Sequence, residues 1–281
     1  KSIDEVEELV KTALDCGINF FDHADIYGGG KSEELFGQVL EKHPEYREKM
    51  IIQTKCAIVP GKRYDFSKEY IMNAVNGSLK RLHTDHVEIL LLHRPDALCD
   101  PQEVAEAFDE LYVSGKVKYF GVSNHTPGQI ALLQKYTKHP IIINQLQLSI
   151  VHSVMIDSGM NMNMKEDFAI DKDGGVLDYC RLNDITIQAW SIVQASWAEG
   201  TFLNHPDYKK LNNILDDLAE KYNVTPAAIA TAWILRHSAH IQAITGTTSP
   251  KHLIETAEAA NIELTRQEWY DLYLASGKPL P

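Results

Sequence analysis

Residues 88–93 read Glu-Ile-Leu-Leu-Leu-His, a nearly all-apolar run that ends in a polar side chain. Two other runs have the same form: residues 19–22 read Asn-Phe-Phe-Asp, and residues 50–55 read Met-Ile-Ile-Gln-Thr-Lys. A strand buried in a parallel sheet is a continuous apolar run, and α/β barrels carry their reactive side chains at the C-terminal ends of such strands. The three runs therefore predict parallel strands that bring Asp22, Lys55 and His93 to one edge of a sheet.

Strand-like runs alternate with helical segments along the whole sequence. The further strands are predicted at residues 119–123, 141–145, 185–190 and 241–244. Helix starts are marked by a capping box at Ser2-Ile3-Asp4-Glu5 and by N-cap residues followed by proline at Asp100-Pro101, Thr126-Pro127, Thr225-Pro226 and Ser249-Pro250. This alternation predicts βα units and a parallel sheet, which is an α/β fold.

The chain of 281 residues has the size of one large α/β barrel, and no linker divides it. We expect a single barrel domain over residues 1–281, a (β/α)8 TIM barrel. Seven strands are visible where the fold needs eight. The missing strand should precede the first helix, so we expect the first barrel strand to be absent from the N-terminus. A doubly wound sheet is the alternative, but it would gather ligand contacts at one switch point.

Composition excludes several classes of partner. The net charge of −12 argues against nucleic acid or an anionic membrane. No apolar stretch approaches the ~20 residues that span a bilayer, and the N-terminus lacks a signal-peptide pattern. The four cysteines contain no CxxC, so we expect reduced thiols in a cytoplasmic protein. Cys56, beside Lys55, is expected to be a packing residue, with a reactive thiol as the alternative.

Residues 149–175 form a long segment that we expect to be irregular. Four of the six methionines lie in it: Met155, Met160, Met162 and Met164. Such adaptable side chains suit the wall of an apolar pocket, and a loop packed against the barrel for stability explains them equally well.

A set of short motifs resembles the aldo-keto reductases, in their bacterial NAD(P)H-dependent branch. Residues 19–27 read Asn-Phe-Phe-Asp-His-Ala-Asp-Ile-Tyr, and they are followed by Lys55, His93-Arg94-Pro95, Gly121-Val122-Ser123-Asn124, Asn144-Gln145 and Trp190-Ser191. Each motif alone is weak, but they occur together, in the right order and over nearly the whole chain. The resemblance implies a barrel enzyme that reduces aldehydes or ketones to alcohols by hydride transfer from NADPH.

The resemblance also implies a role for each of four residues. Tyr27 would be the general acid that protonates the carbonyl oxygen. A free phenol has a pKa of ~10, and the Lys55 ammonium would stabilise its phenolate. Asp22 would keep Lys55 charged and oriented. His93 would hydrogen-bond the substrate oxygen, as in an oxyanion hole.

Cofactor contacts are implied in the same way. Ser123, Asn124 and Gln145 would hold the nicotinamide carboxamide, and Trp190 would offer its flat face to the ring. Backbone groups of Ser191, Ile192 and Val193 would run beneath the pyrophosphate. The last implied contacts come from the loop and helix start formed by Gly246, Thr247, Thr248, Ser249, Lys251 and His252, because a helix N-terminus suits an anion.

One position departs from the NADP-preferring pattern. His252 stands where these family members usually carry arginine, so only Lys251 and His252 remain to meet a 2′-phosphate. Neither replaces a bidentate guanidinium. We therefore expect NADP(H) with a weakened preference and dual use of NAD(H).

Other functions remain as alternatives. A nicotinamide-binding sensor on the same scaffold, like the β subunits of potassium channels, would keep the cofactor site with little turnover. A metal-dependent barrel hydrolase fits poorly with Lys55 at the site. No metal is expected at His23 with Asp22 and Asp25, or at His83 and His86, which we place in a solvated turn. We expect a monomer and a small carbonyl substrate, with Ile26 and Trp197 as further candidates for the pocket wall.

Overall fold

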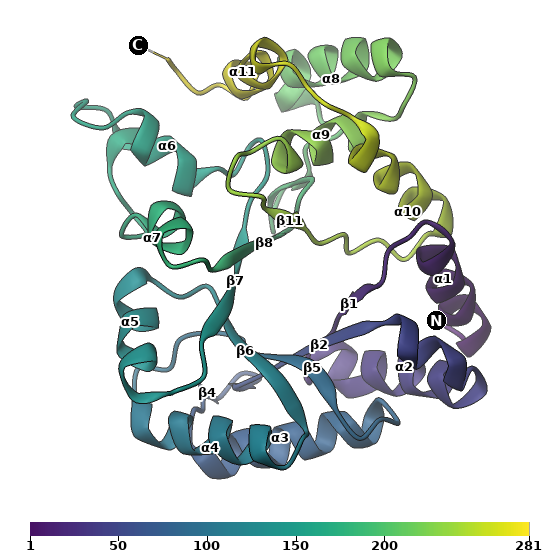
Figure 1. The fold of residues 1–281 in the computed structure, drawn as a ribbon. Helices are drawn as coiled ribbons and strands as arrows, with labels where there is room; N and C mark the ends of the chain where they lie inside the picture. The colour runs from purple at the N-terminus through teal and green to yellow at the C-terminus, as the bar shows by residue number, and fades with distance from the viewer. Residues whose placement is uncertain (281) are drawn as a thin grey trace. The chain divides into compact units, whose positions relative to one another are not determined.

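The computed structural model describes residues 1–280 and shows parallel strands flanked by helices (Figure 1). The chain divides into two compact units, Lys1–Asn144 and the part from Gln145 onward. Strand β7 (Ile141–Gln147) crosses the boundary between them. The α/β class predicted from the sequence is confirmed, whereas the missing first strand and the single domain stay predictions.

The first unit is built on a parallel sheet. Its strands are β1 (Phe20–Asp22), β2 (Ile51–Cys56), β5 (Val87–Leu92) and β6 (Val117–Ser123), followed by the start of β7. The order is β1-β2-β5-β6-β7, and the pairs β1/β2, β2/β5 and β5/β6 are parallel. A short hairpin of β3 (Ile58–Val59) and β4 (Arg63–Tyr64) follows β2. Because parallel strands share one direction, Asp22, Lys55 and His93 come to the same edge.

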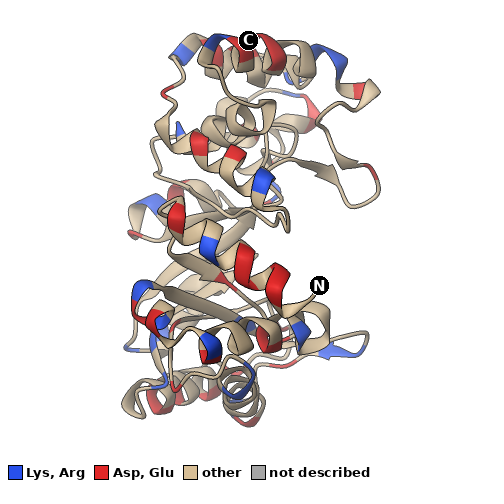
Figure 2. Cartoon of the chain, turned by 90° about the vertical axis from the view of Figure 1, so that its right-hand side faces the viewer, with Lys and Arg blue, Asp and Glu red and all other residues tan. Residues whose placement is uncertain are grey.

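Three of the five α-helices of the first unit, α1, α4 and α5, begin where the sequence predicted. The five are α1 (Ile3–Asp15), α2 (Lys31–Lys42), α3 (Lys68–Arg81), α4 (Pro101–Val113) and α5 (Pro127–Tyr136), with the 3-10 helices η1 (Tyr27–Gly30) and η2 (Pro44–Lys49). Ser2 forms the predicted capping box with Glu5, and the Asp100 and Thr126 side chains accept N-cap hydrogen bonds. Acidic and basic residues lie mostly on the helices and loops rather than on the strands (Figure 2).

The second unit continues the same pattern. Its strands are β8 (Thr186–Trp190), β9 (Gln194–Ser196), β10 (Gly200–Thr201) and β11 (Gln242–Ala243), and β8 pairs in parallel with β11. Its helices are α6 (Val154–Met160), α7 (Val176–Leu182), α8 (Lys209–Tyr222), α9 (Pro226–Leu235), α10 (Pro250–Ala257) and α11 (Arg266–Ala275), with η3 (Asp167–Ala169), η4 (Pro206–Tyr208) and η5 (Glu258–Asn261). Thr225 and Ser249 cap α9 and α10 as predicted.

Two expectations about secondary structure need correction. The segment 149–175 is not irregular throughout, because it contains α6 and η3. The last predicted strand, residues 241–244, shortens to Gln242–Ala243. Just before α6 the Ser153 hydroxyl donates to the Asp157 carboxylate at 2.7 Å. Hydrophobic periodicity does not reveal such a side-chain contact.

Close packing in the first unit fixes the strand positions. Ile89, Leu91 and Ile143 form a buried cluster on the sheet. Gly121 lies against it so tightly that a β-carbon there would stand 2.6 Å from Leu91 Cδ2 and 2.8 Å from the Ile143 carbonyl oxygen. The glycine of the Gly-Val-Ser-Asn motif is therefore required by packing between neighbouring strands.

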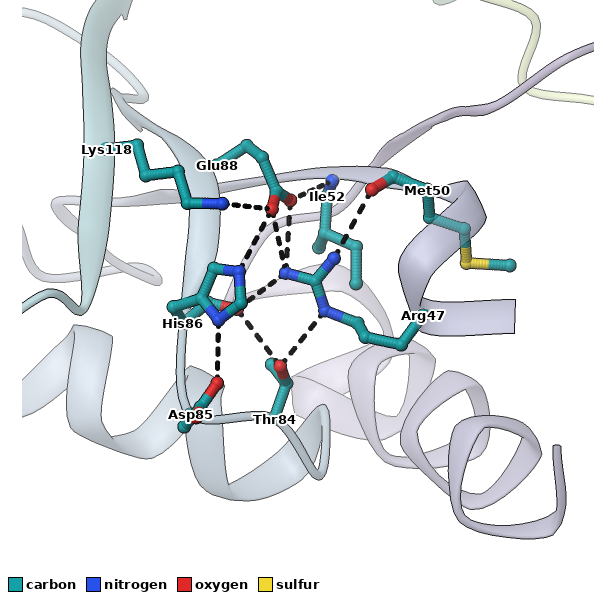
Figure 3. Close-up of polar contacts among 8 residues, drawn as sticks. All are labelled: Arg47, Met50, Ile52, Thr84, Asp85, His86, Glu88 and Lys118. Atoms are coloured by element: carbon teal, nitrogen blue, oxygen red, sulfur yellow. Dashed lines mark hydrogen bonds and ion pairs between the residues drawn. The ribbon is translucent and has the colours of Figure 1, made fainter. Parts of the chain in front are cut away.

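A polar network secures the opposite, N-terminal ends of β2, β5 and β6 (Figure 3). The Glu88 carboxylate accepts hydrogen bonds from the Arg47 guanidinium at 3.0 and 3.1 Å and from the Ile52 amide at 2.8 Å. Lys118 and His86 also contact it, at 3.2 and 3.1 Å. Burial raises the pKa of Glu88, but the Ile52 amide and Arg47 outweigh it and hold this pKa below its usual value.

Candidate active site

Lys55 is the centre of the predicted site. It lies in β2 and is fully buried, and its ammonium donates to Asp22 Oδ2 at 2.6 Å, to the His23 carbonyl at 2.9 Å and to the Tyr27 phenolic oxygen at 3.1 Å. Burial lowers the pKa of Lys55, but Asp22 and Tyr27 outweigh it, so its pKa lies above its usual value. A buried charge with its hydrogen bonds satisfied remains an ammonium at neutral pH.

Tyr27 is held by the chain turn after β1. Its amide donates to the Ala24 carbonyl at 3.1 Å, and η1 then runs through three glycines whose φ angles are 59°, 66° and 91°. Residues with side chains rarely adopt this backbone, so the glycines make the turn possible. Tyr27 is 37% exposed, which leaves its phenol open to solvent while Lys55 contacts it from below.

His93 completes the group. Its amide donates to the Cys56 carbonyl at 2.9 Å, which ties the end of β5 to the end of β2. Its ring meets the Tyr27 ring edge-on, with centroids 5.8 Å apart. Burial, followed by the charge of Lys55, lowers the pKa of His93 to about 3. The imidazole is therefore neutral at physiological pH and carries a single N–H.

These four side chains lie together as a proton-donating arrangement. A solvent-accessible phenol touches a permanent buried cation, a carboxylate fixes that cation, and a neutral imidazole stands beside the phenol. Such a set can donate a proton to an oxygen that gains negative charge and can hydrogen-bond the same oxygen. It lacks a nucleophile paired with a base, which acyl transfer would need.

A second polar group, next to Thr54 and Lys55 of β2, was not predicted from the sequence. Glu33 on α2 is fully buried, accepts from the Thr54 hydroxyl at 2.6 Å and pairs with Arg81 at 2.8 Å. Asp25 donates its amide to the Lys55 carbonyl at 3.0 Å, and its Oδ1 is buried without a hydrogen-bond partner. Burial, then the Glu33 charge, raises the pKa of Asp25 to about 7. Only the long-range pairing of residues 33 and 81 could have revealed this group.

Two of the predicted cofactor residues lie in the first unit. Ser123 ends β6 and is almost fully buried, and Asn124 follows it with a left-handed backbone (φ 59°). The side-chain amide of Asn124 donates through Nδ2 to the Ser123 hydroxyl at 2.8 Å, and the same Nδ2 lies 3.5 Å from the His93 carbonyl oxygen. Polar groups of the first unit thus continue from His93 along the same edge of the sheet.

Gln145 belongs to a row of amides in the second unit. Its Nε2 donates to Gln188 Oε1 at 3.0 Å, and Gln188 Nε2 donates to Gln242 Oε1 at 2.9 Å. The row crosses β7, β8 and β11 in order. Sequence reasoning missed Gln188 and Gln242, although both stand in the predicted strands.

The segment after β8 carries the residues that we predicted to contact the pyrophosphate. Trp190 ends the strand, and its ring lies 6.4 Å from that of Trp197, which is 81% exposed. Ser191 has a left-handed backbone (φ 57°) and donates its hydroxyl to Gln194 Oε1 at 2.6 Å. Ile192 is buried, and the Val193 carbonyl accepts from the Phe202 amide and the Thr201 hydroxyl.

The loop from Gly246 to Ser249 leads into α10 as predicted. The Thr247 amide donates to the Thr245 hydroxyl at 3.5 Å, and the Ser249 amide donates to the Thr247 hydroxyl at 3.2 Å. Ser249 caps the helix through the His252 amide at 3.4 Å. Thr248 lies within this loop, and Lys251 on α10 pairs with Glu255 at 3.7 Å. The amides of Thr247, Ser249 and His252 are thus engaged by hydroxyls of the same loop, and the lysine is shared with a carboxylate.

His23 and His86, which we considered for a metal site from the sequence, and Cys56 have structural roles. The His23 ring packs on Phe36 at 4.4 Å, and burial lowers the pKa of His23 to about 4. His86 belongs to the Glu88 network rather than to a freely solvated turn, which corrects our expectation. Burial raises the pKa of the Cys56 thiol well above its usual value, in keeping with a packing residue. Within residues 1–280, no three His, Cys, Asp or Glu side chains gather to hold a metal ion.

Comparison with known proteins identifies the class. The aldo/keto reductase family matches residues 1–273, and the chain belongs to this family of oxidoreductases. Among curated relatives, the oxidoreductase YdhF of Escherichia coli is 34% identical, and the match covers 98% of this chain and 88% of the relative. The 6-dehydroglucose reductase of Novosphingobium aromaticivorans is 36% identical, and the match covers 99% of this chain and 88% of the relative.

Solved structures agree with this assignment. The thermostable aldo-keto reductase Tm1743, solved with the inhibitor epalrestat, has a TM-score of 0.77 at 26% identity and covers 97% of this chain and 88% of its own. An aldo-keto reductase from Klebsiella pneumoniae in complex with NADPH has a TM-score of 0.75 at 22% identity, and the match covers 99% of this chain and 87% of that chain. Aldo-keto reductases use NADP(H). No helix of residues 1–280 is both long and apolar enough to cross a membrane.

Proposed function

We propose that this chain reduces aldehydes or ketones to alcohols with NADPH, with Tyr27 as the general acid. The observation that supports this most strongly is the contact of the fully buried Lys55 ammonium with the accessible Tyr27 phenol at 3.1 Å. A neighbouring cation stabilises the phenolate that remains after the proton has left. Asp22 offsets the burial of that cation and aims it at Tyr27.

Each residue has one task in this account. Bound NADPH would supply the hydride that reduces the carbonyl carbon. Tyr27 donates its phenolic proton to the carbonyl oxygen as negative charge develops there, and Lys55 stabilises the phenolate. His93, which is neutral above about pH 3, donates a hydrogen bond to the same oxygen and orients it.

The cofactor-binding residues are proposed on the chemistry of their groups. Ser123 and Asn124 in the first unit, and Gln145 in the second, carry hydroxyl and amide groups that suit a carboxamide. Trp190 and residues 191–193 would contact the nicotinamide ring and the pyrophosphate. Residues 246–249 with Lys251 and His252 would meet the adenosine phosphate. Because Lys251 pairs with Glu255, we propose a modest preference for NADPH over NADH.

The substrate class is proposed at the level of small carbonyl compounds. The predicted pocket wall is largely apolar, which favours aromatic aldehydes, whereas a relative named 6-dehydroglucose reductase makes sugar carbonyls a second group to test. NADPH consumption with 4-nitrobenzaldehyde and with 6-dehydroglucose, together with quantified alcohol product, tests the proposal. One alcohol formed per NADPH supports it. Cofactor binding without turnover on either substrate contradicts it and favours the sensor alternative.

A further inference from the structure

A cavity of about 370 Å³ lies in the second unit, between α6, α7, the end of α9 and the start of α11. None of its lining residues belongs to the predicted catalytic or cofactor set. Its size falls in the range of small-molecule pockets. Met155 and Met160 of the methionine-rich segment line this cavity.

The interior of the cavity is apolar and aromatic. Met155, Ile156 and Trp269 are buried beneath it. Trp269 stacks on Trp233 with centroids 4.7 Å apart, and its indole N–H donates to the Trp233 carbonyl. Because that N–H is engaged, Trp269 contributes only apolar surface, and a ligand here needs an apolar body.

The rim carries positive charge in a chain whose net charge is −12. Arg236 and Arg266 both line the cavity. Among residues 1–280 neither guanidinium is engaged by a carboxylate, since Arg236 donates only to the Leu264 carbonyl, through Nε. Asp178 is the one acidic residue on the rim, and Arg181 stands 3.7 Å from it. The rim is therefore cationic overall.

His237 adds a neutral donor to the rim. Its Nδ1 accepts the Ala239 amide at 3.1 Å, so the proton of the neutral ring is on Nε2. Burial, followed by the charge of Arg181, lowers the pKa of His237, which keeps it neutral. The C-terminus of α9, the negative end of its dipole, and the N-terminus of α11, the positive end of its dipole, both lie at this cavity. The two dipoles offset each other, so the charged side chains determine which ligand charge the cavity favours.

We propose that this cavity is a binding site for a small monocarboxylate with an aromatic or aliphatic body, its carboxylate held by Arg266 and Arg236 and its body against Trp269 and the methionines. Guanidinium groups bind carboxylates through paired, charge-assisted hydrogen bonds. The proposal concerns binding alone and does not depend on the reductase function.

Isothermal titration of the full chain with 4-phenylbutyrate tests the proposal, with 4-phenylbutanol as the uncharged control. We expect a dissociation constant of roughly 1 mM or below for the acid and at least tenfold weaker binding of the alcohol. Arg266→Gln, at an exposed position, should weaken binding of the acid roughly tenfold or more. Lys210→Gln, which removes a charge from α8 of the same unit, should leave it unchanged.

A second variant fills the cavity without touching its charges. Gly159 lines it, and a β-carbon built there meets no atom within 4 Å, so Gly159→Leu should fold and abolish binding. Gly128→Leu, at an equally open glycine of α5, is the matched control. The proposal is overturned if the acid does not bind, if acid and alcohol bind equally, or if Arg266→Gln and Gly159→Leu both bind as the parent does. The last result would place the acid elsewhere, for instance beside Tyr27.

Discussion

The ammonium of Lys55 lies 3.1 Å from the phenolic oxygen of Tyr27, and the Lys55 side chain has no exposed surface. An ion pair with Asp22 at 2.6 Å keeps this cation charged inside the protein. Burial of the Lys55–Asp22 ion pair removes both charges from water, and the attraction between them often only balances that cost, so such a pair adds little to the stability of the fold. The arrangement is therefore best explained by the chemistry it permits at Tyr27.

Replacement of Lys55 should abolish this chemistry. We expect Lys55→Met to lower kcat by roughly 10²–10⁴-fold, the usual contribution of general acid–base catalysis, because the phenolate would lose its stabilising cation. NADPH affinity should change far less. Steady-state kinetics and fluorescence titration measure the two effects, and Lys62→Met, at an exposed position, is the control. Unchanged kcat in Lys55→Met would rule out its role.

The preference for NADPH should depend on the pairing of Lys251 with Glu255. Glu255→Gln frees the lysine and should raise the ratio of NADPH to NADH affinity several-fold, whereas Lys251→Gln should lower it by a similar factor, since each exposed ion pair contributes about 0.2–1 kcal/mol. Dissociation constants of both cofactors give the ratio. A parent preference of several hundred-fold for NADPH would contradict the weakened 2′-phosphate site.

Asp25 should make the protein less stable as the pH rises. Its pKa is about 7 in the folded protein, raised by burial and by Glu33, and near 3.9 when unfolded. Between these values the folded state binds the extra proton, so the free energy of unfolding falls as pH increases and levels off above 7. Asp25→Asn should remove this loss and stabilise the protein at pH 8 by up to roughly 4 kcal/mol, about 1.4 kcal/mol for each of about three pKa units.

Urea unfolding of both proteins at pH 4, 6 and 8 measures this difference. The gain from Asp25→Asn should be smallest at pH 4 and largest at pH 8. A gain that does not change with pH would show that the carboxyl group does not titrate as described.

The Glu88 network should stabilise the first unit. Glu88→Gln leaves the Arg47 guanidinium without its carboxylate and should lower the free energy of unfolding by roughly 2–4 kcal/mol at pH 7. Because the pKa of Glu88 is lowered in the folded protein, this stabilisation is present above pH ~4.5 and is lost as the pH falls through the folded value. Denaturant titrations at pH 7 and pH 3 measure it, and an equal loss at both would contradict the charge-based account.

Much of the site was predictable because it lies at the ends of apolar strands. The runs before Asp22, Lys55 and His93 fix both the strand direction and the edge where these side chains meet. Five helix starts were equally readable, because a capping box and N-cap residues followed by proline act through local geometry. These features depend on neighbouring residues, which a sequence displays directly.

Groups that depend on distant pairs were not predictable. Arg81 meets Glu33 across 48 positions of the chain, and the amides of Gln145, Gln188 and Gln242 meet only when three strands are aligned. The Glu88 network gave His86 a structural partner that its turn-like sequence did not suggest. The amide row depends on strand register, and the Glu33–Arg81 pair depends on how α2 and α3 pack. Single-sequence periodicity specifies neither.

The central claim is that Tyr27 donates the proton. NADPH consumption with 4-nitrobenzaldehyde, run in parallel on the parent chain and on Tyr27→Phe, tests it most directly, with NADPH affinity measured on the same samples. We predict a fall in kcat of at least 10²-fold with NADPH affinity preserved, since phenylalanine removes only the hydroxyl. Turnover by Tyr27→Phe close to that of the parent would contradict the account.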